Sequence, residues 1–336
     1  MPGRGTISVE LFEDPGLCPP GARFGRIRAG EGAVLRVAIW RAQGACAGTV
    51  AVLPGRAEFI EKYYEVVAEL LARDFDVAAM DWRGQGGSSR QARHPGKGHI
   101  GHFRDYRADL AALRTQIVEP YLRKPWFALA HSMGGAILID AAHDGDCWFD
   151  RFVATAPMID LCRLRYARGL RELARSLRRS GLSTAFAPGA GGARPYLRKP
   201  FAGNLLTSDP ARYARMAACV AQAPEIAIGA PTIGWVDAAF ALMRRFEDPQ
   251  FAARVKTPAL IVAAGEDRVV DTPAIEAFAR GLKVGGFVTL PHARHEILME
   301  RDAVRSQFWA AFDAFIPGPD ALPRAEGEAD GPSGSN

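Results

Sequence analysis

The sequence has little cysteine and no long apolar run. Its five cysteines are widely spaced and form no Cys-x-x-Cys pair, so we expect neither a disulfide framework nor a structural zinc site. No stretch reaches the about 18 apolar residues of a spanning helix. The N-terminus also lacks the apolar core of a secretory signal. These absences predict free thiols in a cytoplasmic protein.

The net charge of the chain is small, but basic residues are concentrated in one segment. The 42 basic and 37 acidic residues leave a net charge of +5. Residues 163–199 alone contain ten basic residues and a single acid, Glu172. The apolar fraction of 48% supports a substantial buried core, which excludes disorder for most of the chain. The 35 glycines and 23 prolines exclude a long coiled coil.

Short apolar runs alternate with longer amphipathic stretches, first up to Pro157 and again from Pro258. This alternation predicts an α/β fold with a mainly parallel sheet and helices on both faces. A hairpin is expected at residues 26–40. We expect strands at 49–53, 75–80, 126–130, 152–156, 259–263 and 286–290, and helices at 59–73, 103–122, 133–143, 273–282 and 300–315.

The break in this rhythm divides the chain. The interrupting segment is helical in pattern and basic, and the residues after Pro317 are acidic and rich in Gly and Ser. We expect an N-terminal arm (1–23), a first core part (24–157), an inserted helical cap (158–255), a second core part (256–317) and a disordered tail (318–336).

A serine stands where a predicted strand meets a predicted helix. Small residues lie two positions before and after Ser132, namely Ala130 and Gly134, as a sharp turn between closely packed backbones requires. The N-terminus of the following helix favours negative charge near this serine. We therefore predict that Ser132 is a nucleophile rather than only a helix cap.

A serine nucleophile needs a base and an orienting carboxylate, which follow in the order acid, then histidine. The acid candidates after the strand at 259–263 are Glu266, Asp267 and Asp271, of which Asp267 is favoured by its Gly-containing turn. The base candidates are His292 and His295, and we favour His295 because His292 follows the strand end too closely. The other histidines are expected to be polar surface or loop residues: His94, His99, His102, His131 and His143.

Acyl transfer also needs donors for the tetrahedral oxyanion. The backbone N–H of Met133, directly after the nucleophile, is the first candidate. The second is the backbone N–H of Arg56, in the loop after the strand at 49–53. For the guanidinium of Arg56 two roles are open: it pairs with Glu58, or it faces a substrate phosphate.

Five segments resemble one known family. They are LPGRAE (53–58), DWRGQGGS (81–88), AHSMGG (130–135), AGED (264–267) and HEILME (295–300). They resemble the lysophospholipase and monoacylglycerol lipase group of α/β-hydrolases, and most of all its bacterial lysophospholipase branch. The resemblance implies the α/β-hydrolase fold, a Ser132–Asp267–His295 triad and an oxyanion hole at Arg56 and Met133. It covers residues 24–315 and leaves the loop at 81–88 a structural role.

These features predict a serine esterase that cleaves the acyl ester of a single-chain lipid, a lysophospholipid first of all. No metal or cofactor is expected. Monoacylglycerol lipase and short-chain carboxylesterase activities share the triad and stay open as alternatives. An aminopeptidase would need carboxylates in the cap, whose basic segment has only Glu172. A non-catalytic hydrolase-fold binding protein would normally lack part of the triad.

The basic segment also bears on partners. In a helix over residues 165–179 the leucines and the arginines occupy opposite sides. We expect the leucines to pack on the core and the arginines to face solvent. The second interpretation, compatible with the first, is peripheral contact with anionic phospholipid at the inner face of the membrane. Nucleic acid is not an expected partner, because the segment lacks interleaved aromatic residues.

Overall fold

A computed structural model describes residues 18–162 and 167–317. Most of the expected N-terminal arm and all of the expected tail at 318–336 therefore lie outside the described residues. Within the described ranges, the five cysteines are half-buried and form no disulfide bond. None of the helices described there is long and apolar enough to cross a membrane.

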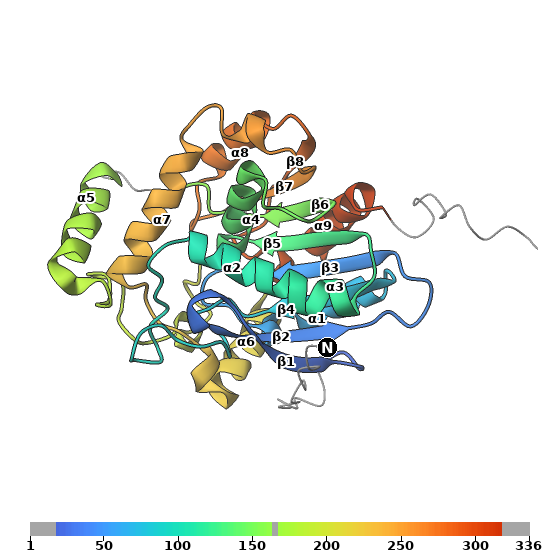
Figure 1. Cartoon of the computed structure of the whole chain (residues 1–336), viewed down its shortest axis with the longest axis horizontal. Helices are drawn as coiled ribbons and strands as arrows, with labels where there is room; N and C mark the ends of the chain where they lie inside the picture. The colour runs from blue at the N-terminus through green and yellow to red at the C-terminus, as the bar shows by residue number, and fades with distance from the viewer. Residues whose placement is uncertain (1–17, 163–166, 318–336) are drawn as a thin grey trace, which may run out of the picture.

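An eight-stranded sheet runs through the molecule in the order β1-β2-β4-β3-β5-β6-β7-β8 (Figure 1). The first two strands form the predicted hairpin, β2 pairs antiparallel with β4, and every later pair is parallel. The strands are β1 (Arg23–Arg28), β2 (Val34–Trp40), β3 (Gly48–Leu53), β4 (Phe75–Met80), β5 (Trp126–His131), β6 (Arg151–Thr155), β7 (Ala259–Ala264) and β8 (Gly285–Leu290).

Helices cover both faces of this sheet. An ion pair of 2.7 Å between Arg73, after α1, and Asp313 of α9 joins two helices on one face. On the other face, Arg107 of α2 lies 3.4 Å from Asp140 of α4. The helices are α1 (Tyr64–Leu71), α2 (Arg104–Leu113), α3 (Glu119–Tyr121), α4 (Met133–Asp144), α5 (Ala167–Leu177), α6 (Pro210–Gln222), α7 (Ile233–Phe246), α8 (Thr272–Arg280) and α9 (Asp302–Phe315).

The predicted elements lie close to those observed, with differences at their ends. The expected helix at 59–73 starts with a 3-10 turn at Ile60–Tyr63 before α1 begins. The expected helix at 103–122 consists of α2, a wider turn at Arg114–Val118, and α3. Strands β3, β4, β5 and β7 are buried at every position, because helices cover both faces of a parallel sheet.

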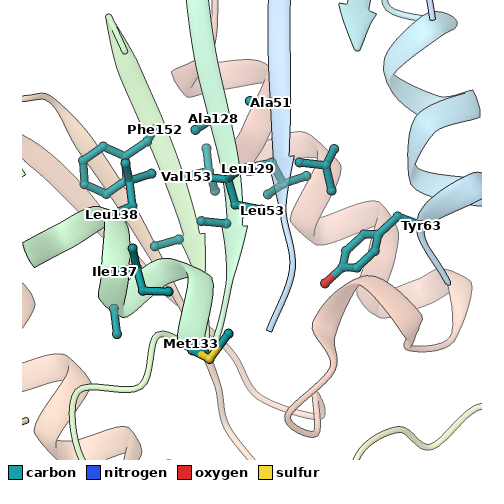
Figure 2. Close-up of a cluster of buried hydrophobic side chains, with 14 of the residues drawn as sticks. Ala51, Leu53, Tyr63, Ala128, Leu129, Met133, Ile137, Leu138, Phe152 and Val153 are labelled. Atoms are coloured by element: carbon teal, nitrogen blue, oxygen red, sulfur yellow. The ribbon is translucent and has the colours of Figure 1, made fainter. Parts of the chain in front are cut away.

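The core lies where α4 packs on the central strands. Figure 2 shows Ile137 and Leu138 of α4 beside Leu129 of β5 and Phe152 of β6, and all four side chains are fully or almost fully buried. Each fully buried side chain of this size stabilises the fold by about 1.5–3 kcal/mol. This packing fixes the first turn of α4, which starts directly after Ser132, against the sheet.

Three helices, α5, α6 and α7, lie in the segment between β6 and β7, beyond the carboxyl ends of the parallel strands (Figure 1). The outermost of them, α5, packs against α7 through arginines. Arg171 Nη1 lies 2.5 Å from Glu247 and its guanidinium lies over the Phe240 ring at 5.7 Å. Arg178 Nη1 lies 2.8 Å from Asp237. Asp237 of α7 and Glu247, directly after α7, therefore select the arginine-bearing side of α5.

This orientation shows that the expected packing of α5 is wrong. Leu170 and Leu173 are 41% and 50% exposed, while Ala174 is buried. The contacts with Asp237, Phe240 and Glu247 are made by Arg171 and Arg178 instead. Arg163 and Arg165 of the basic segment lie outside the described residues.

Candidate active site

The chain turns sharply at Ser132, between β5 and α4. The serine has φ 48° and ψ −111°, a conformation that non-glycine residues rarely adopt and that is common at functional sites. A Cβ atom at Gly134 would lie 2.5 Å from the Leu53 carbonyl oxygen. Glycine is required there because the first turn of α4 lies directly against the end of β3. The predicted strand–turn–helix is present.

Three side chains from distant parts of the chain meet at this turn. The Oγ atom of Ser132 lies 3.0 Å from Nε2 of His295. On the other side of the ring, Nδ1 of His295 lies 2.8 Å from Oδ2 of Asp267. Asp267 follows β7 and His295 follows β8, so the carboxyl edge of the parallel sheet brings them together. In this arrangement His295 can accept the proton of Ser132, and Asp267 can stabilise the imidazolium that forms.

Asp267 is held by its own loop as well as by His295. Its Oδ1 accepts hydrogen bonds from the backbone N–H groups of Val269 at 2.7 Å and Val270 at 3.0 Å. Burial works to raise the pKa of Asp267, but the hydrogen bond and charge attraction of His295, with these N–H groups, outweigh it and lower the pKa. The carboxylate stays ionised and can orient the imidazole.

The structure leaves the other acid and base candidates outside this group. His292 has a side chain that is 84% exposed, and its Nδ1 lies 3.5 Å from Glu266. Asp271 accepts a hydrogen bond of 2.9 Å from the Ala274 N–H and caps α8. Of the candidates after β7 and β8, Asp267 and His295 are brought to Ser132.

His131 is not the polar surface or loop residue expected, because it is the last residue of β5 and is buried. Its ring centroid lies 4.9 Å from that of His295, and its Nδ1 lies 3.1 Å from the Thr155 carbonyl oxygen. Burial is the main cause that lowers the pKa of His131 to about 3. His131 is therefore a neutral neighbour of the catalytic candidates at neutral pH.

The loop after β3, which carries Arg56, is fixed by Gln85. The Gln85 amide donates to the carbonyl oxygens of Gly55 at 2.7 Å and Glu58 at 3.0 Å. Its Oε1 accepts from the N–H of Ala57 at 3.1 Å. Gln85 belongs to the loop at 81–88, for which we expected a structural role. Its hydrogen bonds show that this loop supports the loop after β3. Sequence reasoning did not single out Gln85.

The two residues that carry the expected oxyanion donors line the same cavity as the serine. Arg56, Met133, Ser132 and His295 all line it. Within the described ranges, neither the Arg56 N–H nor the Met133 N–H has a protein acceptor. An oxyanion hole requires donors of this kind, preorganised and without a partner in the resting protein.

Sequence reasoning also missed a buried ionic cluster beside the site. Lys62 Nζ lies 2.6 Å from Glu58 Oε1 and 2.7 Å from Glu296 Oε1. The Tyr63 hydroxyl donates to the second oxygen of Glu58 at 2.5 Å. Burial works to raise the pKa of Glu58, but attraction by Lys62 and His131 outweighs it and lowers the pKa to about 2. The spacing of Glu58 and Lys62, four residues apart, was the available signal.

The cavity above the serine has a volume of about 410 Å³. Apolar side chains from the core and from the segment between β6 and β7 form much of its wall, a composition suited to a hydrocarbon chain. They include Met158, Leu161, Leu206, Trp235 and Val270. Charged residues are also present, namely Arg56, Glu58, Lys199 and Glu296.

The sheet order, the turn at Ser132 and the two later loops define an α/β-hydrolase. A family model described as "Serine aminopeptidase, S33" matches residues 44–302, and the chain belongs to that family. It is 37% identical to lysophospholipase L2 of Escherichia coli (strain K12) over 267 residues, which cover 76% of each chain. The resemblance stated from the sequence is thereby confirmed.

Solved structures share the fold. A thermostable carboxyl esterase from Bacillus coagulans matches with a TM-score of 0.72 and 20% identity, covering 89% of this chain and all of that one. A soluble variant of monoglyceride lipase from Saccharomyces cerevisiae matches with a TM-score of 0.68 and 19% identity, covering 86% and 93%. The predicted fold class is confirmed.

Proposed function

We propose that this protein is a serine hydrolase that cleaves the acyl ester of lysophospholipids. The observation that carries the proposal is the hydrogen-bonded chain from Ser132 through His295 to Asp267 at the base of a largely apolar cavity. The similarity to lysophospholipase L2 supports the choice of substrate.

In the proposed reaction, Ser132 Oγ attacks the ester carbonyl carbon while His295 Nε2 accepts the serine proton. Asp267 stabilises the imidazolium that forms. The N–H groups of Arg56 and Met133 donate to the tetrahedral oxyanion, each contributing about 3 kcal/mol. The ester C–O bond then breaks, and the glyceryl oxygen leaves with the proton from His295. Water, deprotonated by the same histidine, then attacks the acyl-serine, the bond between the acyl carbon and Ser132 Oγ breaks, and His295 returns the proton to Oγ as the fatty acid leaves.

The division of the chain supports this function. We propose that residues 158–255 form a cap on a core made of residues 24–157 and 256–317. Leu206 and Trp235 of this segment line the same cavity as Ser132. The cap would then set which acyl chain fits, while the core supplies the reacting groups.

We also propose that the protein contacts anionic lipid at the cytoplasmic face of the membrane through α5. Leu170 and Leu173 are exposed on its outer side, and Arg179 is exposed beyond its end. Exposed leucines beside basic residues are typical of helices that lie in the interface of an anionic bilayer. Such a contact would bring the cavity to the layer that holds single-chain lipids.

The test measures acid released by the full chain from 1-decanoyl lysophosphatidylcholine, 1-decanoylglycerol and a short nitrophenyl ester, and aniline released from an amino-acid anilide. We expect release from the lysophospholipid, labelling by a fluorophosphonate probe, and loss of both in Ser132→Ala. Retention of most activity in that variant would refute the nucleophile assignment. Cleavage of decanoylglycerol alone would favour the monoacylglycerol lipase alternative. Cleavage of an amino-acid anilide alone would favour an aminopeptidase.

A further inference from the structure

The guanidinium of Arg56 lies at the cavity without a carboxylate partner among the described residues. Its Nη2 donates to the Gly229 carbonyl oxygen at 2.9 Å, and its carbon lies 5.0 Å from the centroid of the Trp235 ring. Its Nε is buried and has no hydrogen-bond partner. Glu58 does not pair with Arg56, because Lys62 occupies that carboxylate. The first of the two interpretations from the sequence is therefore wrong.

A buried cation without a carboxylate partner is favourable only when an anion can pair with it. Burial lowers the pKa of Arg56 to about 10, against the smaller opposite effects of Tyr106 and Tyr196, so the side chain stays charged at neutral pH. A guanidinium has five N–H donors, and a backbone carbonyl takes one of them here. The planar fork of arginine matches a phosphate in a two-point hydrogen bond. Stacking on Trp235 holds that fork in place.

The position of Arg56 relates this anion site to the reacting ester. Its N–H is the proposed oxyanion donor, and its side chain reaches about 6–7 Å from its Cα. In a 1-acyl lysophospholipid, about six bonds separate the ester carbonyl carbon from the phosphorus, an extended span of about 7 Å. One residue can therefore contact the oxyanion through its backbone and the headgroup phosphate through its side chain.

We propose that the Arg56 guanidinium binds the phosphate of the lysophospholipid headgroup and selects phosphate-bearing single-chain esters over neutral ones. This inference rests on the proposed function. Lys199 also lines the cavity and adds positive charge to its wall. The neutral monoacylglycerol lacks an anionic group that could pair with the charged guanidinium.

The first test compares kcat/KM for 1-decanoyl lysophosphatidylcholine with kcat/KM for 1-decanoylglycerol. We expect the ratio of the two to fall about tenfold or more in Arg56→Met, and to fall less in Arg56→Lys, which keeps the charge but lacks the fork. The ratio cancels any loss that both substrates share through the Arg56 amide. If Arg56→Met does not fold, Arg56→Lys decides. An unchanged ratio overturns the inference.

Arg90→Met is the matched control. Arg90 is also a half-buried arginine that donates to backbone carbonyls, those of Ser88, Pro95 and Glu225, but it does not line the catalytic cavity. We expect its ratio to equal that of the wild type. A fall as large as that of Arg56→Met would mean a general effect of arginine removal and would overturn the inference.

A binding measurement separates this inference from the proposed function. Calorimetry follows decyl phosphate and decyl glucoside added to Ser132→Ala and to Ser132→Ala/Arg56→Met. We expect Arg56→Met to lower the affinity for decyl phosphate about tenfold or more and to leave the affinity for decyl glucoside unchanged. Equal decyl phosphate affinities overturn the phosphate site even if lysophospholipid is cleaved. If the wild type cleaves no lysophospholipid but decyl phosphate binding depends on Arg56, the proposed function fails and the site stands.

Discussion

Gln85 donates a hydrogen bond of 2.7 Å to the carbonyl oxygen of Gly55 and thereby fixes the turn that carries the Arg56 amide. The same side chain makes two further bonds to this loop. An oxyanion donor acts only when it is held in position. A residue that does not line the cavity can therefore control the chemical step by fixing the loop that carries the donor.

We expect Gln85→Met to lower kcat by about 10- to 100-fold with a small change in KM, since a displaced donor is lost mainly in the transition state. Steady-state kinetics on a nitrophenyl ester measures this. The matched control is Gln116→Met, because Gln116 also bonds to the backbone in both directions, at Arg28, far from the site. An equal loss of kcat in the control would contradict a positioning role for Gln85.

Asp267→Asn should lower kcat by about 10³- to 10⁴-fold while the fold is kept. The asparagine amide would donate to His295 Nδ1, so Nε2 would carry the hydrogen and could not accept the serine proton. The control is Asp271→Asn, the same change at the cap of α8, where asparagine also caps well and kcat should stay within about twofold. Comparable losses in both variants would argue against Asp267 as the orienting acid.

His131 should make the protein sensitive to moderate acid. The pKa of His131 is about 3 in the folded protein and about 6.5 in the unfolded chain, so the unfolded chain binds a proton at a higher pH than the folded protein does. The contribution of the neutral imidazole to the free energy of unfolding is complete above about pH 6.5 and is lost as the pH falls toward about 3. Between pH 7 and 4.5 this group should remove about 3 kcal/mol from the free energy of unfolding.

Urea unfolding of His131→Phe at both pH values measures this effect. The variant should lose about 3 kcal/mol less than the wild type over the same interval. His292→Phe is the control, since that side chain is 84% exposed and its removal should keep the wild-type dependence. A His131→Phe protein with the wild-type pH dependence would show that the buried imidazole is not the cause.

Removing an exposed leucine from α5 should weaken binding to anionic membranes. Transfer of the Leu173 side chain into lipid is worth about 1 kcal/mol, so Leu173→Ser should reduce the partition coefficient about fivefold. Sedimentation with phosphatidylglycerol vesicles measures it. Val284→Ser removes a similarly exposed apolar side chain far from α5 in sequence, directly before β8, and should bind like the wild type. Equal partition coefficients for the wild type, Leu173→Ser and Val284→Ser would contradict the proposed membrane contact.

The positions of Ser132, Asp267 and His295 were predictable because each follows a strand, and the ends of parallel strands meet at one edge. Gln85 and the Lys62–Glu296 pair were not, since their partners are distant in sequence and are known only after folding. The packing of α5 was predicted wrongly from its apolar pattern. That pattern contains no information about Asp237 of α7 and Glu247 directly after it, with which the arginines pair.

The strands before and after α5, α6 and α7 are neighbours, with Ala154 of β6 opposite Ile261 of β7. The segment between β6 and β7 therefore leaves and rejoins the sheet at one place, without separating this pair of strands. During evolution such a segment can lengthen, shorten or change its lining while the register beneath it is preserved. A new acyl preference can then arise from substitutions that never disturb the reacting side chains.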